Sequence, residues 1–446
     1  MNVIIGGAGE VGSHAAEVLS TAGHGVTVID LSPDKLRAVS NVLDVRTLVG
    51  HCAHVDVLRE AGCEKCDLLV AATDVDEINL LSASLGKQIG AKRTIVRVHH
   101  TANFALRSTR YAEHLGVDEM LCPEHLTALE IGRAIRNPGS IALEDFSRGQ
   151  LLMQRLKVMP GSGAEGKKLS NLTLPPSVRL ATVEDEAGPH IAQAATEIHE
   201  GHWVTVIGET KSFESARKLF SKEKDKRQHI AIMGGGSTSV WLARRLKSKL
   251  FSVRLFVNDH ARAEELAGKL SHVTVLVADP TDSTTFADEQ IDKADVFIAA
   301  TDDDEHNILG CAQAKARGTT LVIAVVQRTK YIHLLEHVKI DFTFSPRNVA
   351  VNAILSVIDV GPVRSVATFA DRSSAVYEVH PHKRAKILGH ELRNIKLPPQ
   401  SMIAAIRRDD RVYVPGAEDQ VRSGDTLLVI APVGVHSQLR KVFVAK

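Results

Sequence analysis

Short runs of apolar residues recur along the first hundred positions and alternate with stretches in which apolar residues are spaced three or four apart. The runs at residues 2–5, 25–29, 68–72 and 94–98 are continuous and rich in β-branched side chains. Such runs are typical of strands buried on both faces of a parallel sheet, and the stretches between them predict amphipathic helices. The alternation predicts a doubly wound α/β fold, whose ligands bind at the carboxyl ends of the strands.

The same pattern occurs a second time, about 227 positions later. Residues 3–19 read VIIGGAGEVGSHAAEVL and residues 230–246 read IAIMGGGSTSVWLARRL. Likewise, LLVAATDVDEINLL at residues 68–81 corresponds to VFIAATDDDEHNIL at residues 296–309. A correspondence of this length indicates an internal duplication.

Each copy continues into a smaller shared segment, KKLSNLTLPP at residues 167–176 and HELRNIKLPP at residues 390–399. Short alternating apolar runs around these segments predict a compact β-rich module of roughly 80 residues. The predicted architecture is therefore two tandem Rossmann-like doubly wound parallel sheets, each followed by a small β-rich α+β module. We expect these domains at residues 1–125, 140–222, 228–348 and 366–446.

Composition adds limits. The 54 basic and 53 acidic residues give a net charge of +1, so no global field recruits nucleic acid or an anionic membrane surface. No run of 18 apolar residues occurs, and the amino terminus leads straight into a predicted strand, so we expect a cytosolic protein. The five cysteines are few and odd in number, which argues against a disulfide framework.

A glycine-rich turn follows the first predicted strand. Its six residues match the G-x-G-x-x-G pattern: Gly7, Ala8, Gly9, Glu10, Val11 and Gly12. Asp30 ends the next predicted strand, where a carboxylate accepts the ribose hydroxyls of NAD and repels the extra phosphate of NADP. These features favour an NAD(H) site, with ATP or ADP as an open alternative because both carry an adenosine ribose and phosphates. The competing interpretation is a Rossmann fold whose glycines serve only packing.

Three further side chains are expected at the same rim of the sheet. Thr73 and Asp74 follow a predicted strand in a sequence, AATD, that both copies keep. They are candidates for ligand contact, with capping of the following helix as the alternative. Arg97 stands in an otherwise apolar predicted strand, where its guanidinium either pairs with a phosphate or forms a structural ion pair.

The second copy departs from this pattern at three positions. Ser239 stands where the first copy has Gly12, Val257 stands opposite Asp30, and Val325 stands opposite Arg97. We therefore expect at most a weaker second nucleotide site. Its candidate residues are Gly234, Gly235, Gly236, Ser237, Thr238, Val257, Asp279, Thr301 and Asp302.

A cluster of potential zinc ligands lies in the first copy and offers a different hypothesis. The cluster consists of His51, Cys52, His54, Cys63 and Cys66. Its C-x-x-C pair resembles a zinc or redox motif, but the pair falls in a helix-to-strand connection that the repeat already explains. We expect neither a metal nor a thiol switch there.

The glycine turn, Asp30, the AATDVDEIN segment and the following β-rich module together resemble the RCK (KTN plus TrkA-C) domain family over essentially the whole chain. Two such units in one chain are similar to the regulatory subunits of bacterial potassium uptake systems. This resemblance implies a ring-forming homo-oligomer, peripheral on the inner face of the membrane, that assembles on a TrkH- or TrkG-type membrane subunit. It also implies that the nucleotide regulates and is not consumed.

Two rival functions share part of this evidence. A nicotinamide-dependent dehydrogenase uses the same fingerprint, but it needs an acid or base placed beside the nicotinamide, and the small modules offer no concentrated set of candidates. We therefore expect that the protein is not an enzyme. An RCK-type regulator of another channel or antiporter is the nearer alternative, because one sequence does not identify the residues that choose the partner.

Overall fold

The computed structural model describes residues 1–100, 103–104, 110–136, 140–141, 150–175, 177–185, 188–220, 227–328, 338–358, 362–368, 374–409 and 411–444. The chain divides into two compact units, each built from two separate segments. Unit 1 comprises Met1–Gly132 and Lys226–Leu355, and unit 2 comprises Arg133–Asp225 and Ser356–Lys446. Each unit therefore contains one segment from each half of the duplicated chain.

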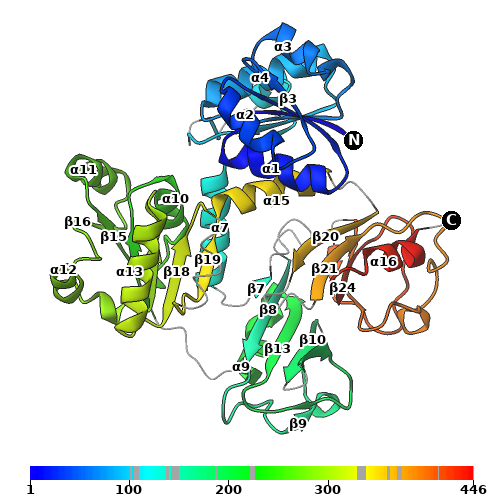
Figure 1. Ribbon diagram of the computed structural model, residues 1–446. Coiled ribbons are helices and arrows are strands. Elements are labelled where there is room, and N and C mark those ends of the chain that lie inside the picture. Colours follow the sequence, from blue (N-terminus) through cyan, green and yellow to red (C-terminus); the bar gives the residue numbers. More distant parts are fainter. Residues whose placement is uncertain are drawn as a thin grey trace. The chain divides into compact units, whose positions relative to one another are not determined.

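The first Rossmann domain of unit 1 is a six-stranded parallel sheet with the order β3-β2-β1-β4-β5-β6. Its strands are β1 (Asn2–Gly6), β2 (Gly25–Asp30), β3 (Arg46–Val49), β4 (Leu68–Ala71), β5 (Arg93–Arg97) and β6 (Glu119–Leu121). Its helices include α1 (Glu10–Thr21), α2 (Pro33–Ser40), α3 (Val55–Glu60), α4 (Asp76–Ile89), α6 (Arg110–His114) and α7 (Pro123–Arg136). Figure 1 shows α1 and α4 on opposite faces of the sheet.

The strand order reverses between β1 and β4, and this reversal places the glycine turn at the rim of the sheet. β1 pairs in parallel with both β2 and β4, so that Gly6 lies opposite Ile29 on one side and Ala71 on the other. Segments that follow these three strands consequently converge at one edge, which is where doubly wound folds bind ligands.

The second Rossmann domain repeats this topology with the order β16-β15-β14-β17-β18-β19. Its strands are β14 (Gln228–Met233), β15 (Phe251–Val257), β16 (Thr274–Val277), β17 (Val296–Ala299), β18 (Leu321–Val325) and β19 (Phe342–Phe344). Its helices include α10 (Ser237–Arg245), α11 (His260–Lys269), α12 (Ser283–Asp288), α13 (Asp304–Ala316) and α15 (Pro346–Ile358). Two doubly wound parallel sheets are thus present, which confirms the predicted fold class.

The two Rossmann domains of unit 1 contact each other through helices. The indole ring of Trp241 in α10 packs edge-on against the imidazole of His125 in α7, with ring centroids 4.6 Å apart. It also lies against Phe104, which belongs to the apolar cluster formed with residues of β5 and β6, and Trp241 packs against that cluster. A tryptophan of the second domain therefore contributes to the core of the first.

Unit 2 contains two small antiparallel modules of similar design. The first has the strand order β11-β10-β13-β8-β7 and the second β20-β21-β24-β22-β23. The first consists of β7 (Ser140–Ile141), β8 (Leu151–Lys157), β10 (Val178–Asp185), β11 (Gly188–Ile191), β13 (Trp203–Glu209) and α9 (Thr210–Phe220), with β9 (Lys167–Lys168) and β12 (Glu197–Ile198) as a separate ribbon. The second consists of β20 (Val363–Thr368), β21 (Ser374–Val379), β22 (Met402–Arg408), β23 (Arg411–Tyr413), β24 (Thr426–Pro432) and α16 (His436–Phe443).

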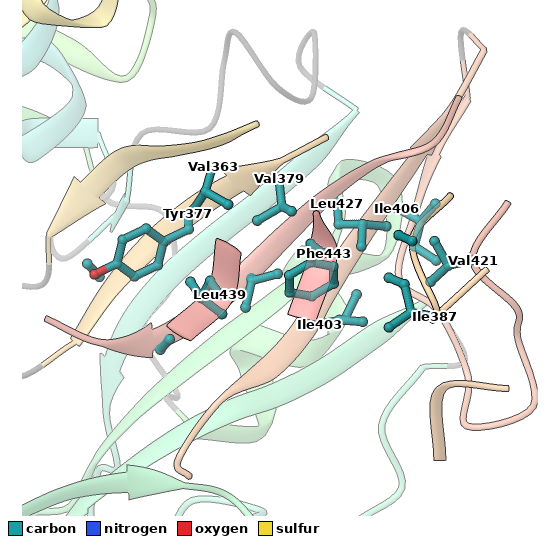
Figure 2. Packing of buried hydrophobic residues seen from close by; sticks show 14 residues of the cluster. Val363, Tyr377, Val379, Ile387, Ile403, Ile406, Val421, Leu427, Leu439 and Phe443 are labelled. Atoms are coloured by element: carbon teal, nitrogen blue, oxygen red, sulfur yellow. The ribbon is translucent and has the colours of Figure 1, made fainter. Parts of the chain in front are cut away.

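Each module has its own core, and the two modules share a third. In the second module, Leu439 and Phe443 of α16 pack against Val379, Leu427 and Ile403 of the sheet (Figure 2). A separate cluster joins residues of both modules across the faces of their sheets. Its buried members are Leu151, Met153, Ala181, Ile207, Val376, Ala404, Ala405, Val412, Leu428 and Ile430.

Candidate functional site

Two glycines of the first turn are required by the packing of the backbone itself. Gly7 has φ of 107°, and a Cβ there would lie 2.9 Å from the backbone of Ala72. A Cβ on Gly12 would overlap the carbonyl oxygen of Gly7, so α1 touches the turn that precedes it. Gly7 also donates a hydrogen bond from its N–H to the carbonyl of Ile29, at 2.7 Å. For these two glycines, the packing interpretation is sufficient.

Gly9 differs, because no residue in the described part of the chain crowds it. A Cβ on Gly9 would meet only the carboxylate Oδ1 of Asp74, at 3.9 Å. Gly9 is also the N-cap of α1, and its residue type offers no side chain to the first N–H groups of that helix. An uncapped helix start beside open space is the arrangement that binds phosphates in nucleotide sites. Gly9 therefore favours a ligand over a purely structural turn.

Asp30 lies beside the turn at the end of β2. Its Oδ2 accepts the backbone N–H of Ala8 at 2.6 Å, and its Oδ1 accepts the N–H of Ser32 at 2.8 Å. These bonds fix the carboxylate next to Gly9 and α1. Because an ionised carboxylate has about four acceptor positions, two remain for hydroxyl groups of a ribose.

Thr73 takes part in a network of hydrogen bonds within the domain. Its N–H and hydroxyl both donate to Oδ1 of the buried Asn79, at 2.8 and 2.6 Å. The Asn79 amide in turn donates to the carbonyls of Thr73 and Arg97, at 2.9 and 3.0 Å. Asn79 thus ties the ends of β4 and β5 together at the rim of the sheet, a role that sequence reasoning did not assign to it.

Asp74 and Arg97 form an ion pair at this rim, with Nη1 of Arg97 3.4 Å from Oδ1 of Asp74. The Arg97 side chain is only 14% exposed, whereas that of Asp74 is 77% exposed. Nε of Arg97 is buried and has no hydrogen-bond partner within the described part of the chain. The structural ion pair named above as an alternative is therefore present. Because its acid is exposed, the pair contributes little to the free energy of folding, and the guanidinium retains N–H donors for a ligand.

A cavity of about 510 Å³ joins these features. It is lined by Ala8, Gly9, Glu10, Val11, Ser13, Lys35, Asp74, Arg97, Pro123, Glu124, Gln327, Pro346 and Arg347. Four predicted site residues are not among the lining residues: Gly7, Gly12, Asp30 and Thr73. Of these, Asp30 accepts a hydrogen bond from the lining residue Ala8. The volume lies within the range of small-molecule sites.

Several lining residues were not anticipated from the sequence. Lys35 comes from the start of α2, five positions after Asp30, and Glu124 comes from the start of α7. Glu124 receives a hydrogen bond from Nδ1 of His99 at 2.9 Å. Burial opposes its charge, but His99 and the nearby charge of Arg97 outweigh burial and lower the pKa of Glu124.

Three more unanticipated lining residues, Gln327, Pro346 and Arg347, belong to the second Rossmann domain. Arg347 places Nη1 2.9 Å from Oε2 of Glu10 and Nη2 3.9 Å from Oε2 of Glu17. No local motif marks these residues, because they meet the first glycine turn only after both domains have folded. To find them, one would have to know how the two domains pack against each other, which a motif within one stretch of sequence does not show.

The second glycine turn has the same backbone but different surroundings. Gly234 has φ of 118° and donates to the carbonyl of Phe256, as Gly7 does to Ile29. This register places Val257 where the first copy has Asp30, and Val257 is 4% exposed. Arg262 of α11 donates from Nε to the carbonyl of Gly235 at 3.0 Å. An apolar side chain and a guanidinium thus stand where the first copy has the Asp30 carboxylate.

Two further candidates of the second site, Thr301 and Asp279, are engaged by local contacts. Thr301 donates from its N–H and hydroxyl to Oδ1 of Asn307, at 2.9 and 2.7 Å, as Thr73 does to Asn79. Asp279 accepts the N–H and hydroxyl of Thr281 and lies 3.3 Å from Nε2 of His306. Burial would raise the pKa of Asp279, but these partners lower it. Ser239 donates to the carbonyl of Ala300 at 3.3 Å, so this helix start carries a side chain where the first copy allows none.

The cysteines of this cluster belong to the first domain's core, whereas His51 is half-buried and His54 is exposed. Cys63 and Cys66 are buried, with their sulfur atoms 3.9 Å apart, and they pack with Leu58 and Leu69. The rings of His51 and His54 stack on each other, 4.7 Å between centroids. Among the residues that the structure describes, no group of three or more His, Cys, Asp or Glu side chains is placed to hold a metal ion.

Comparison with known proteins adds family evidence. The TrkA-N domain model matches residues 3–123 and again residues 230–346, and the TrkA-C domain model matches residues 376–444. The chain is 32% identical over 443 residues to a Trk system potassium uptake protein TrkA homolog of Archaeoglobus fulgidus, covering 99% of this chain and 100% of that one. It is 29% identical over 437 residues to the Trk system potassium uptake protein TrkA of Vibrio alginolyticus, covering 96% and 95%.

Solved structures show a related fold at low sequence identity. The GsuK channel bound to NAD matches with a TM-score of 0.63 and 17% identity, over 100% of this chain and 79% of that one. GsuK bound to ADP matches with a TM-score of 0.52 and 13% identity, over 80% and 69%. Among the helices described by the structure, none is long and apolar enough to cross a membrane.

Proposed function

The chain belongs to the TrkA family of Trk system potassium uptake proteins, and on that premise we propose that it is the nucleotide-sensing regulatory subunit of a potassium uptake system. NAD(H), or alternatively ATP or ADP, binds at the glycine turn of the first Rossmann domain. Binding controls potassium flux through a TrkH- or TrkG-type membrane subunit, on whose cytoplasmic side the protein assembles as a homo-oligomer.

The observation that carries this proposal is the cavity at the first turn. Gly9 and the start of α1 leave room for phosphate, while Lys35 and Arg97 supply positive charge around it. Asp30 stands beside the turn, where a ribose would follow the phosphate. An adenosine diphosphate group satisfies all of these features, and NAD and ADP both contain one.

The site is suited to sensing because both Rossmann domains line it. A ligand shifts a conformational equilibrium only by as much as its affinities for the two states differ. A cavity that receives Glu10 from one domain and Arg347 from the other changes its lining whenever the domains move relative to each other. Nucleotide binding is thereby linked to domain geometry, and domain geometry to the membrane partner.

A calorimetric titration of the full chain with NADH, and separately with ADP and ATP, tests the ligand. We expect one tight site per chain, with the NADH absorbance unchanged after hours of incubation. Potassium flux would then be measured in vesicles that hold a TrkH-type protein, with and without the chain and its ligand. Absence of binding by all three nucleotides would contradict the proposal, and steady NADH oxidation with an added metabolite would indicate a dehydrogenase.

A further inference from the structure

Arg347 lies in the cavity of a domain to which it does not belong. It is the second residue of α15 in the second Rossmann domain, and it pairs with Glu10 and Glu17 of α1 in the first. Its side chain is 18% exposed, whereas those of Glu10 and Glu17 are 64% and 54% exposed. Nε of Arg347 is buried and, as far as the described residues extend, has no hydrogen-bond partner. A well-buried guanidinium is thus held by two acids that lie mostly in solvent.

This ion pair stands where a nucleotide would place its phosphates. Glu10 follows Gly9 directly and is the first residue of α1, whose start faces the cavity. The charged residues that line the cavity are three acids, Glu10, Asp74 and Glu124, and three bases, Lys35, Arg97 and Arg347. Phosphates entering this balanced set compete with Glu10 for cations. Arginine is well suited to such an exchange because its planar fork matches phosphate and carboxylate alike.

We propose that Arg347 leaves Glu10 and Glu17 when a nucleotide binds and pairs with its phosphates, so that the second Rossmann domain supplies a residue of the first domain's ligand site. This inference rests on the proposed function, because it requires a nucleotide at the first turn. It assigns the Arg347–Glu10 pair a definite role, that of a latch between the domains in the unliganded state. When the ligand binds, a pair between Arg347 and phosphate replaces the pair between Arg347 and Glu10, so the contact between the domains changes its partner.

The exchange is not reciprocal between the two halves. The residue of α7 that corresponds to Arg347 is Glu124, since both follow the proline that begins their helix. Glu124 carries the opposite charge and is engaged by His99. In the second turn, Ser237 replaces Glu10, and position 244, which corresponds to Glu17, is an arginine. The latch therefore serves the first site alone.

The test compares nucleotides that differ only in phosphate. The full-length wild type and Arg347→Gln would be titrated with AMP, ADP and ATP by calorimetry, and with adenosine by ligand-observed NMR. We expect Arg347→Gln to weaken ADP or ATP by about 10- to 100-fold, the usual range for a charge-assisted hydrogen bond, and to leave adenosine unchanged. Arg328→Gln is the matched control, because Arg328 pairs with Glu305 in the same domain and does not line the cavity.

Two more variants separate a contact from a folding defect. Arg347→Lys keeps the charge but lacks the planar fork, so it should lose less affinity for ADP or ATP than Arg347→Gln does. Glu10→Gln removes the competing acid and should tighten ADP or ATP several-fold, and this gain should shrink in the Arg347→Gln background. An equal loss for all four ligands, or an equal Glu10→Gln gain in both backgrounds, would overturn the inference. If Arg347→Gln binds ADP and ATP as tightly as the wild type does, the inference is overturned but the proposed function is not. If the wild type binds no nucleotide, both are overturned.

Discussion

Asn79 and Asn307 occupy the same place in the two Rossmann domains and make the same hydrogen bonds. Each receives the N–H and hydroxyl of a threonine and donates to two carbonyls at the ends of neighbouring strands. The charged side chains at the rim of the sheet differ instead, since Asp30 and Arg97 have Val257 and Val325 as counterparts. The hydrogen-bonded scaffold and the charged rim of one fold can therefore change independently.

The largest effect is expected from a substitution at the start of α1 that gives the first copy the residue of the second. Gly12→Ser introduces the residue that the second copy carries, and its Cβ overlaps the carbonyl of Gly7. We expect the first domain to lose up to about 3 kcal/mol of stability, the upper range for overpacking, together with its NADH binding. Hydrogen exchange on peptides from each domain measures the local loss, and calorimetry measures binding.

The reverse substitution, Ser239→Gly, is the control for this experiment. It should change the stability of the second domain by no more than about 1 kcal/mol, the conformational effect of a glycine within a helix. Equal effects of the two substitutions would show that the helices pack alike on their turns.

The carboxylate at the end of β2 offers a direct test of ligand recognition. Asp30→Ala should weaken NADH binding by about 1 to 3 kcal/mol, because it removes the acceptor for the ribose hydroxyls and the bond that positions Ala8. Val257→Ala, at the equivalent place in the second copy, should leave the affinity as it is. Unchanged NADH affinity in Asp30→Ala would refute the assignment of the site.

Asp76 provides a test through pH. It is 2% exposed and accepts hydrogen bonds from the N–H groups of His99 and His100 and from Asn103. Burial would raise its pKa, but these bonds and the charge of His99 lower it. A lowered folded pKa means that the stabilisation is complete above the unfolded value, about 4, and is lost as the pH falls through the folded value.

Asp76→Asn should therefore remove about 1 to 2 kcal/mol from the first domain at pH 7 and flatten its loss of stability in acid. Amide exchange of the segment after β5, measured from pH 6 to pH 3, gives both quantities. A variant as stable as wild type at pH 7 and as sensitive to acid would contradict the role of this carboxylate.

The smallest effect is expected at the second turn. Ser237→Ala should change the NADH affinity of the tight site by less than about 0.3 kcal/mol, because the second copy contributes little to binding. Calorimetry on the same preparation as the Asp30 variants makes the comparison direct. A large loss would show that the second turn takes part in the tight site.

The sequence predicted the parts of this molecule that depend on local patterns. Buried strands, glycine turns and the repeat each leave a signal within about 20 residues, so both sheets and the place of Asp30 could be anticipated. The lining of the cavity could not, because Lys35, Glu124 and Arg347 meet only through tertiary packing. Thr73 shows a second limit, since the AATD pattern suggested contact with a ligand but gave no sign that the Thr73 hydroxyl donates to Asn79.

The apolar cluster shared by the two modules of unit 2 has a consequence for dilute protein. Because Met153 and Leu428 lie on one chain, the modules meet at an effective concentration fixed by the connecting chain, and dilution does not separate them. If the chain were cut between its halves, the two modules would have to associate by collision. Leu428 and Ile430 would remain exposed to water until they did. Duplication within one polypeptide thus converts a bimolecular association into part of folding, and its first-order kinetics are independent of how much protein the cell makes.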